Sequence, residues 1–527
     1  MAHAEGRSAD AAGHHGRPLG TGPGARRRRV PSPPRAPVAQ TREMTTDHVD
    51  VLIVGAGLSG IGAAWRLQHD APGTTYAILE SRDAIGGTWD LFRYPGVRSD
   101  SDMFTLAYPF RPWREPESMA GGERIRDYIR DTAAQARITE HIRFGTRVTG
   151  AQWSSDEARW TVRTRGGATW TCSFLYVCAG YYDYEQGHQP DFPGLDDFAG
   201  RFVHPQFWPA DLDHAGRRVV VVGSGATAVT LVPAMAQTAG HVTMLQRSPS
   251  YLTALARTDG VADALRRFLP AGVAHSLVRT KNVLLTSAFY QLCRRRPETA
   301  KKLLRAGARR FLDDPAYLDE HFTPAYEPWD QRLCVVPGGD FFRAVADGRA
   351  SVVTERIDRF VPEGVRLESG RVLDADVVVS ATGLTLLPLG GMDLEVDGEP
   401  VDVGRTVVYR GLMLGGVPNL AFCFGYTNAS WTLRADLSSR YVARLVRHLR
   451  RRGLASATPR VPAADTPRLP FLDLTSSYVR RAVDRFPRRT GREPFDVRQN
   501  YLLDRIVMRT ATLDRDMDLV PGRVPAG

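Results

Sequence analysis

Two glycine-rich turns, each placed between a buried strand and a helix, constrain the fold of this chain more than any other feature. The pattern residues are Gly55, Gly57 and Gly60 after the expected strand at 49–54, and Gly223, Gly225 and Ala228 after the one at 217–222. In such a turn the first glycine permits the tight bend and the second lets the backbone approach a pyrophosphate. The third position lets the helix pack on the strand, and helix-terminal amides face the phosphates. The sequence therefore predicts an α/β fold with two dinucleotide-binding (Rossmann-like) domains.

The residue that ends the next strand distinguishes the two nucleotides. Glu80 lies twenty residues beyond Gly60, where a carboxylate accepts hydrogen bonds from a ribose 2′-hydroxyl and repels a 2′-phosphate. This favours an adenosine without a 2′-phosphate, as in FAD or NAD. Arg247 lies nineteen residues beyond Ala228, and a cation there suits the 2′-phosphate of NADP(H), although an ordinary surface arginine is the alternative. Opposite charges at these two positions predict FAD and NADPH in one chain.

Length and composition indicate a globular protein of two or three domains. The chain has 527 residues, of which 43% are hydrophobic and 24% are charged, and it contains no run of eighteen apolar residues and no apolar leader. Its five cysteines are odd in number and form no CxxC pair, which argues against a disulfide framework, a zinc site and a disulfide-reductase couple. We expect a reducing, cytoplasmic location, with membrane association as the alternative.

Positive charge gathers in two segments. Residues 1–43 hold eight arginines against three acids, without periodicity, and are expected to be disordered. This tail is either a translated leader before Met44 or a basic arm that contacts nucleic acid or an acidic membrane.

The second positively charged segment is residues 251–312, which hold thirteen basic and three acidic side chains, with apolar residues at helical spacing. We expect a helical insert with a solvated basic face; the alternatives are attraction of phosphate-bearing cofactors and contact with anionic lipid, whereas no nucleic-acid partner is expected.

Further sequence segments indicate a particular class of dinucleotide-binding protein. The stretch "FAGRFVHPQFWP" (198–209) matches the pattern FxGxxxHxxxW(P/D), and related motifs lie at 86–108, 326–342, 381–384 and 425–437. Together they resemble the class B flavoprotein monooxygenases of Baeyer–Villiger type I, in particular the actinobacterial branch of FAD monooxygenases that activates thioamide prodrugs. The similarity runs from about residue 47 to about residue 510.

The resemblance implies that the NADP domain, with its helical insert, is inserted into a discontinuous FAD domain. The expected parts are a disordered basic tail (1–46), the first FAD part (47–182), the linker, NADP domain and helical insert (183–329), the second FAD part (330–510) and a C-terminal tail (511–527). The strand and glycine turn at 374–383 are expected to close the first sheet. A similar strand and turn at 174–182 are expected to precede the linker.

The same resemblance assigns the chemistry to Arg332 and Asp100. The matching arginine stabilises a negatively charged C4a-peroxyflavin and the oxyanion formed after attack on a carbonyl, and an always-charged guanidinium with several donors suits that role. The matching aspartate orients the arginine beside the flavin. From sequence alone, Arg332 would be a surface arginine, and Asp100 would be an N-cap near Met103, for which Asp102 is the better candidate.

Cofactor contacts are carried over residue by residue. For FAD they are, besides the turn, Ser59, Glu80, Thr88, Trp89, Asp90, Leu91, Asp100 and Val148. Arg98 and Ser99 are expected on the NADP path. For NADP they are Gly223, Ser224, Gly225, Ala226, Thr227, Ala228, Val229, Thr230, Arg247 and Ser248.

Four other residues have weaker assignments. His204 and Trp208 belong to the linker, where the family uses them to couple domain position to NADP binding, and we do not expect His204 to act as a general base. Trp431 is expected near the nicotinamide or substrate, or in the core. Gln331 replaces the lysine that many Baeyer–Villiger enzymes carry before the active arginine, so NADPH preference depends more heavily on Arg247.

The predicted function is an NADPH- and O2-dependent FAD monooxygenase that converts a ketone to an ester or lactone through a C4a-peroxyflavin. One alternative is oxygenation of sulfur or nitrogen in a sulfide, thioamide or amine. Another is an NADPH oxidase that releases hydrogen peroxide. A third is a non-catalytic flavoprotein that senses redox state or acts at a membrane, which the two intact turns, Asp100 and Arg332 speak against.

Overall fold

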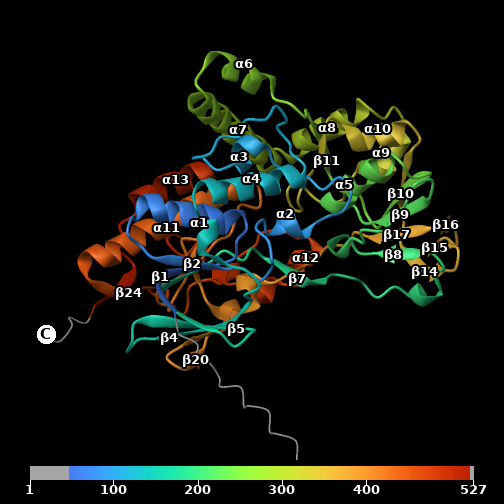
Figure 1. The fold of residues 1–527 in the computed structure, drawn as a ribbon. Coiled ribbons are helices and arrows are strands. Elements are labelled where there is room, and N and C mark those ends of the chain that lie inside the picture. Colours follow the sequence, from blue (N-terminus) through green and yellow to red (C-terminus); the bar gives the residue numbers. More distant parts are fainter. Residues whose placement is uncertain (1–46, 523–527) are drawn as a thin grey trace, which may run out of the picture. The chain divides into compact units, whose positions relative to one another are not determined.

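Two β-sheets, one behind each glycine-rich turn, organise residues 47–522, which are the part of the chain that the computed structural model describes (Figure 1). The predicted disordered tail (1–46) lies outside the described residues, as do residues 523–527. Helices cover the sheets, so the predicted α/β class is confirmed.

The first sheet has eleven strands with a parallel centre. The parallel strands, in spatial order, are β3 (Ile142–Arg143), β2 (Tyr76–Leu79), β1 (Asp47–Val54), β6 (Thr169–Val177) and β23 (Leu420–Phe422). Beyond them, β6 pairs with β5 (Arg159–Thr164), and the sheet continues through β4 (Val148–Ser154), β19 (Asp393–Val396) and β20 (Glu399–Pro400). On the other branch, β23 pairs with β22 (Met413–Leu414), which pairs with β21 (Val408–Tyr409).

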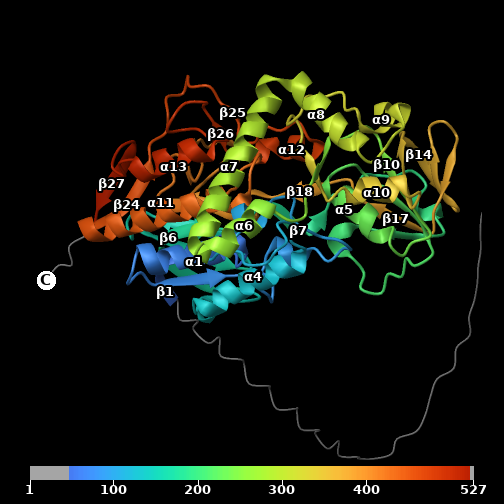
Figure 2. The same ribbon diagram turned by 90° about the horizontal axis from the view of Figure 1, so that it is seen from above.

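Helix α1 (Leu58–Asp70) follows the first glycine turn, and the long helix α11 (Trp431–Arg452) packs beside it, as Figures 1 and 2 both show. The central strand β1 is apolar along consecutive residues, Val51 to Val54, all of which are buried. A strand in a parallel sheet is covered on both faces, which explains why its sequence is a continuous apolar run.

The second sheet is fully parallel and contains the strand before Gly223. Its order is β13 (Ala350–Thr354), β10 (His241–Gln246), β9 (Arg218–Val222), β17 (Val377–Ser380) and β8 (Arg201–Val203). Helices α5 (Ala226–Met235) and α10 (Asp340–Ala346) pack against its strands.

This order corrects one prediction. The strand at 374–383 does not close the first sheet: it is β17, and Val377 pairs with Val219 of β9 in the second sheet. Its apolar run suits any doubly covered parallel sheet, so the residues do not specify which sheet it joins. The strand expected at 174–182 is the end of β6, in the first sheet. The domain bounds stay a prediction, with β13 and β17 inside the range 330–510.

The helical insert has the predicted secondary structure. It consists of α6 (Gly260–Phe268), α7 (Ala271–Arg295) and α8 (Pro297–Arg309), followed by α9 (Pro315–Phe322). The buried guanidinium of Arg279 in α7 donates to the carbonyl oxygens of Phe104, Thr105 and Ala107, so α7 is held against α3 (Met103–Leu106). Across residues 47–522, no helix combines the length and the apolarity that crossing a bilayer would need.

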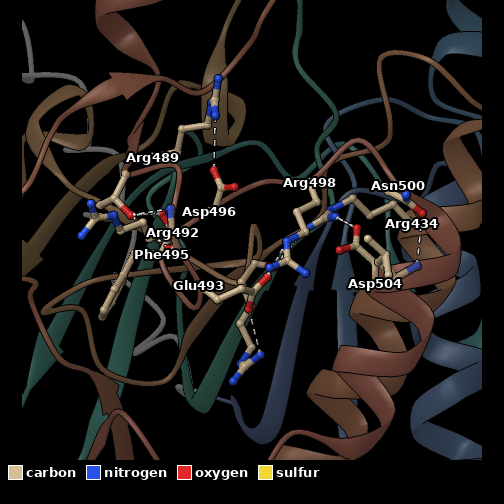
Figure 3. A network of polar contacts seen from close by, with 12 residues as sticks. Arg434, Arg489, Arg492, Glu493, Phe495, Asp496, Arg498, Asn500 and Asp504 are labelled. Atoms are coloured by element: carbon tan, nitrogen blue, oxygen red, sulfur yellow. Dashed lines mark hydrogen bonds and ion pairs between the residues drawn. The ribbon is translucent and has the colours of Figure 1, made fainter. Parts of the chain in front are cut away.

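A buried ion pair connects the C-terminal helix α13 (Tyr501–Thr510) to α11 (Figure 3). Arg434 of α11, which is 1% exposed, pairs with Asp504 of α13 and donates to the carbonyl oxygen of Arg410 at 2.8 Å. The Tyr426 hydroxyl donates to the same carboxylate at 2.7 Å. Farther along, β27 (Met517–Pro521), in the expected C-terminal tail, pairs with β24 (Leu454–Pro459).

We expect Asp504→Ala to lower the free energy of unfolding by about 3–5 kcal/mol, because it leaves the Arg434 guanidinium buried without its counter-charge. Chemical denaturation of the purified protein measures the loss. The matched control is Asp484→Ala, which removes the exposed partner of Arg488 and should cost less than about 1 kcal/mol. Equal losses in the two variants would contradict the role given to the buried pair.

Candidate active site between the two glycine-rich turns

One cavity of about 1090 Å³ reaches both glycine-rich turns. Gly55 and Gly57 of the first turn, Gly223 and Gly225 of the second, and Arg332 all line it. A dinucleotide bound at either turn would therefore share this space with one bound at the other. The two turns thus open into a common chamber, in which groups bound at each of them can meet.

The first turn accepts only glycine at two positions. An ideal Cβ on Gly60 would lie 1.9 Å from the carbonyl oxygen of Gly55, so α1 packs directly on the turn. Gly55 has φ +103°, and a Cβ there would lie 2.8 Å from the carbonyl oxygen of Cys178. Gly57 faces the loop at Gly86 and Gly87, its ideal Cβ 3.5 Å from the Cα of Gly87. The turn has the close packing that a dinucleotide-binding turn requires.

Glu80 is the predicted ribose contact of the first turn. Its carboxylate, at the end of β2, is buried and lines the cavity. Oε2 accepts a hydrogen bond from the amide of Ala56 at 2.6 Å, and Oε1 accepts one from the amide of Arg82 at 2.9 Å. Burial raises the pKa of Glu80, while these amide donors act in the opposite direction. The backbone thus fixes the carboxylate beside the turn, where its oxygens can accept hydrogen bonds from the ribose hydroxyls of an adenosine, which fits that half of FAD.

The second turn has the same backbone geometry as the first and more open space above its middle glycine. Gly223 has φ +134°, and a Cβ there would lie 2.3 Å from the carbonyl oxygen of Ala381. A Cβ on Gly225 would meet no atom within 4 Å, so space for phosphates lies over the start of α5. Arg247 and Ser248 line the cavity at the end of β10. Within residues 47–522, Arg247 is exposed and forms no ion pair, so its guanidinium is available to a 2′-phosphate.

Arg332 and Asp100 form a bidentate ion pair in the cavity wall. Nε of Arg332 lies 2.9 Å from Oδ2 of Asp100, and Nη2 donates to Oδ1 at 2.9 Å. The side chains are 33% and 27% exposed, respectively, and both line the cavity. The neighbouring carboxylate raises the pKa of Arg332 further above its ordinary value. The predicted charge-assisted contact is present, and Asp102, rather than Asp100, caps α3, its side chain accepting from the amide of Thr105.

The other predicted cofactor residues divide into two groups. Those that line the cavity are Ser59, Thr88, Trp89, Arg98, Ser99, Val148, Ser224, Ala226, Thr227 and Thr230. Those that lie behind its wall are Gly60, Asp90, Leu91, Ala228 and Val229. Gly60 and Ala228 are the packing positions of the two turns, so their place behind the wall agrees with that role.

Asp90 and His204 are engaged by protein groups. The buried Asp90 carboxylate lies within 3.0 Å of guanidinium nitrogens of Arg82, Arg93 and Arg130, so it holds the loop around Trp89 in place. Nδ1 of His204 accepts from the amide of Gln206, and Nε2 lies 3.3 Å from the carbonyl oxygen of His188. Neither His204 nor Trp208 lines the cavity, which agrees with their expected place in the linker.

Sequence reasoning missed a group of tyrosines in the cavity wall. The hydroxyls of Tyr181 and Tyr182 form a hydrogen bond of 3.0 Å, and Tyr478 of α12 (Ser477–Arg480) lines the same wall. Tyr181 also stacks on Trp431, with ring centroids 5.3 Å apart, and Nε1 of Trp431 donates to Oγ of Ser59 at 2.7 Å. The available signal was the run "GYYDY" directly after buried β6, at the carboxyl edge where parallel sheets place ligands.

Two Rossmann-type turns that open into one cavity, with an arginine–carboxylate pair in its wall, define an oxidoreductase of the two-dinucleotide flavoprotein class. A solved structure titled "Oxidized steroid monooxygenase bound to NADP" has the same fold, with a TM-score of 0.71 and 24% identity over 90% of this chain and 100% of that chain. The predicted fold class, two Rossmann-like units in one chain, is confirmed.

Proteins with similar sequences identify the family to which this chain belongs. The family profile described as "Flavin-binding monooxygenase-like" matches residues 49–265. The FAD-containing monooxygenase EthA of Mycobacterium tuberculosis is 48% identical over 473 residues, which cover 89% of this chain and 97% of the relative. The putative FAD-containing monooxygenase MymA of the same species is 48% identical over 477 residues, covering 89% and 96%. The chain belongs to the flavin-binding monooxygenase family, which confirms the predicted family resemblance.

Proposed function

We propose that the chain is an NADPH- and O2-dependent FAD monooxygenase that converts a ketone to an ester or lactone, with FAD at the first turn and NADPH at the second. Bound FAD would take the hydride of NADPH and activate oxygen. In the balanced overall reaction, the ketone, O2, NADPH and one proton give the ester, water and NADP+. The observation that supports this proposal best is the Asp100–Arg332 pair in the wall of the cavity that both turns share.

Arg332 is suited to stabilise charge on a substrate oxygen. Its two bonds to Asp100 use Nε and Nη2, and within residues 47–522 Nη1 has no protein partner. The N–H groups of Nη1 are therefore free to donate to the oxygen of a carbonyl as negative charge develops on it. Asp100 would hold the guanidinium in one orientation, so that no reorganisation is needed during the reaction.

Arg247 is the proposed recognition group for the 2′-phosphate, because Gln331 provides no cation and also lines the cavity. We expect Arg247→Ala to raise the Kd for NADP+ at least about tenfold, since a hydrogen bond to a charged group contributes roughly 1.5–3 kcal/mol. The Kd for NAD+ should change little. Titration calorimetry with each nucleotide measures both values.

The matched control is Arg217→Ala, which removes an exposed arginine just before β9, at the opposite end of the same sheet. Its nucleotide affinities should equal those of the wild type. An Arg247→Ala variant that binds NADP+ as tightly as the wild type would refute this assignment.

Oxygenation of a sulfide, thioamide or amine is the second candidate, and the tyrosine cluster favours it. Burial raises the pKa of Tyr182 to about 12 and that of Tyr181 well above its ordinary value, so both phenols stay protonated near neutral pH. Transfer of one oxygen atom to sulfur or nitrogen leaves the other oxygen in need of a proton. Tyr181 and Tyr182 line the cavity and are suited to donate to it.

Turnover with NADPH and 18O2 separates these reactions. The FAD-loaded full chain is given a panel of ketones, sulfides and thioamides, and the products are analysed by mass spectrometry beside NADPH and peroxide assays. One 18O atom in an ester, with one NADPH consumed per product, would support the ketone reaction. Labelled sulfoxide without ester would select the second candidate. Hydrogen peroxide as the sole product would overturn the monooxygenase and indicate an NADPH oxidase.

A further inference from the structure

We propose that α6 and α7 dock on an anionic lipid bilayer. Their outer side carries large apolar side chains that are 47–78% exposed. We call these residues the α6–α7 surface: Val261, Phe268, Val273, Leu277, Leu284 and Leu285. Figure 2 looks down on this part of the molecule, with α6 and α7 at the front of the view.

Helix α7 has one buried and one exposed side that carry apolar side chains. Its inner side buries Ala274 and Val278. The exposed residues Val273, Leu277 and Leu284 follow at intervals of four and seven, which places them on one face of the helix. Packing within the chain explains only the buried side. An exposed apolar stripe of this kind marks a surface that meets something other than water.

Helix α6 continues the pattern. Val261, Ala264 and Phe268 are spaced three and four residues apart, so they share a face, and all three are exposed. Phe268 has the largest exposed fraction among them, 78%. The guanidinium of Arg267 lies 5.9 Å from its ring centroid, so a cation stands directly beside the apolar tip.

The charges of the helical insert indicate which kind of partner the α6–α7 surface fits. The acids of the helical insert already have cations: Asp259 pairs with Lys281, Asp263 lies 3.9 Å from Arg266, and Glu298 pairs with Lys301 at 2.7 Å. Within residues 47–522, five exposed cations of the same segment have no acidic partner: Arg267, Arg295, Arg296, Lys302 and Arg310. None of the five lines the cavity, so they are not placed to hold the cofactor phosphates.

Apolar side chains beside unpaired cations match the boundary of an anionic bilayer. The apolar tips would enter the acyl region, while the cations would meet lipid phosphates. A second copy of the chain is a poorer partner, because pairing two identical surfaces brings the same unpaired cations together. An anionic membrane supplies the opposite charge and the apolar medium at once.

Vesicle sedimentation of the FAD-loaded full chain tests the proposal. We expect the wild type to sediment with phosphatidylcholine–phosphatidylglycerol vesicles at low salt, and neither with phosphatidylcholine alone nor at high salt. The double variants Phe268→Ser/Leu284→Ser and Arg267→Glu/Arg295→Glu should each lower the partition coefficient by at least about tenfold. Unchanged FAD content and thermal midpoint would establish that the variants are folded.

Matched controls lie on other helices and loops. Val461→Ser removes an apolar side chain that is 63% exposed, and Arg451→Glu reverses an exposed cation in the last turn of α11, as Arg295→Glu does in α7. Both should bind vesicles like the wild type. Residues 1–46 are the same in all variants, so their charge cannot produce a difference.

Three outcomes would overturn the proposal. The first is a wild type that does not sediment with the anionic vesicles. The second is sedimentation that neither double variant reduces. The third is a dimer, seen by light scattering, that Phe268→Ser/Leu284→Ser dissociates while vesicle binding is absent, which would make the surface a contact between copies. If a double variant does not fold, the lipid and salt dependence of the wild type decides.

Discussion

Arg332→Ala is expected to remove nearly all oxygenated product while NADPH still reduces the bound FAD. The guanidinium lies in the shared cavity, and Asp100 fixes it through two bonds of 2.9 Å. Loss of one preorganised donor to a developing oxyanion costs about 10²–10³ in kcat. Hydride transfer between two bound cofactors needs no such donor. Product formation is measured by gas chromatography, and FAD reduction by anaerobic absorbance with NADPH.

Two further variants sharpen this result. Arg332→Lys keeps a positive charge but cannot form the bidentate contact with Asp100, so product formation should lie between those of the wild type and Arg332→Ala. Arg294→Ala is the matched control, since it breaks an ion pair of 2.9 Å with Asp330, two residues from Arg332 in the sequence. It should leave turnover unchanged. Ester formation at the wild-type rate in Arg332→Ala would refute the proposed role of Arg332.

The parts of the fold that were predictable are those that local backbone geometry dictates. A strand, a tight turn and a closely packed helix require glycine at Gly55 and Gly60, so the first dinucleotide unit is readable from its residues. The valines of β17 carry no comparable restriction. They suit either parallel sheet, and their pairing with Val219 depends on the path of the whole chain.

The site was less readable than the fold. Asp100 and Arg332 are 232 residues apart, and only the family resemblance brought them together before the geometry was known. The tyrosine cluster joins the start of β7 (Tyr182–Gly187) to α12, a juxtaposition that no local pattern encodes. Likewise, helical spacing predicted α7, but it could not tell which of two apolar sides the protein buries, because both have the same period.

Gly60→Ala is expected to cost the protein its FAD and about 1–3 kcal/mol of unfolding free energy. The new Cβ would lie 1.9 Å from the carbonyl oxygen of Gly55, a backbone atom that cannot move without opening the turn. To relieve the clash, α1 must separate from β1, which withdraws its amides from the pyrophosphate position. FAD absorbance of the purified protein and chemical denaturation, with and without added FAD, measure the two effects.

Gly307→Ala provides the matched control, since Gly307 is also a helical glycine but has no atom within 4 Å of an added Cβ. It should keep its FAD and gain up to about 1 kcal/mol from the better helix propensity of alanine. The contrast separates steric packing at the turn from the general effect of a glycine substitution in a helix. Full FAD content in Gly60→Ala would show that the helix can move off the strand without loss of the cofactor, and the first turn would then not be the FAD site.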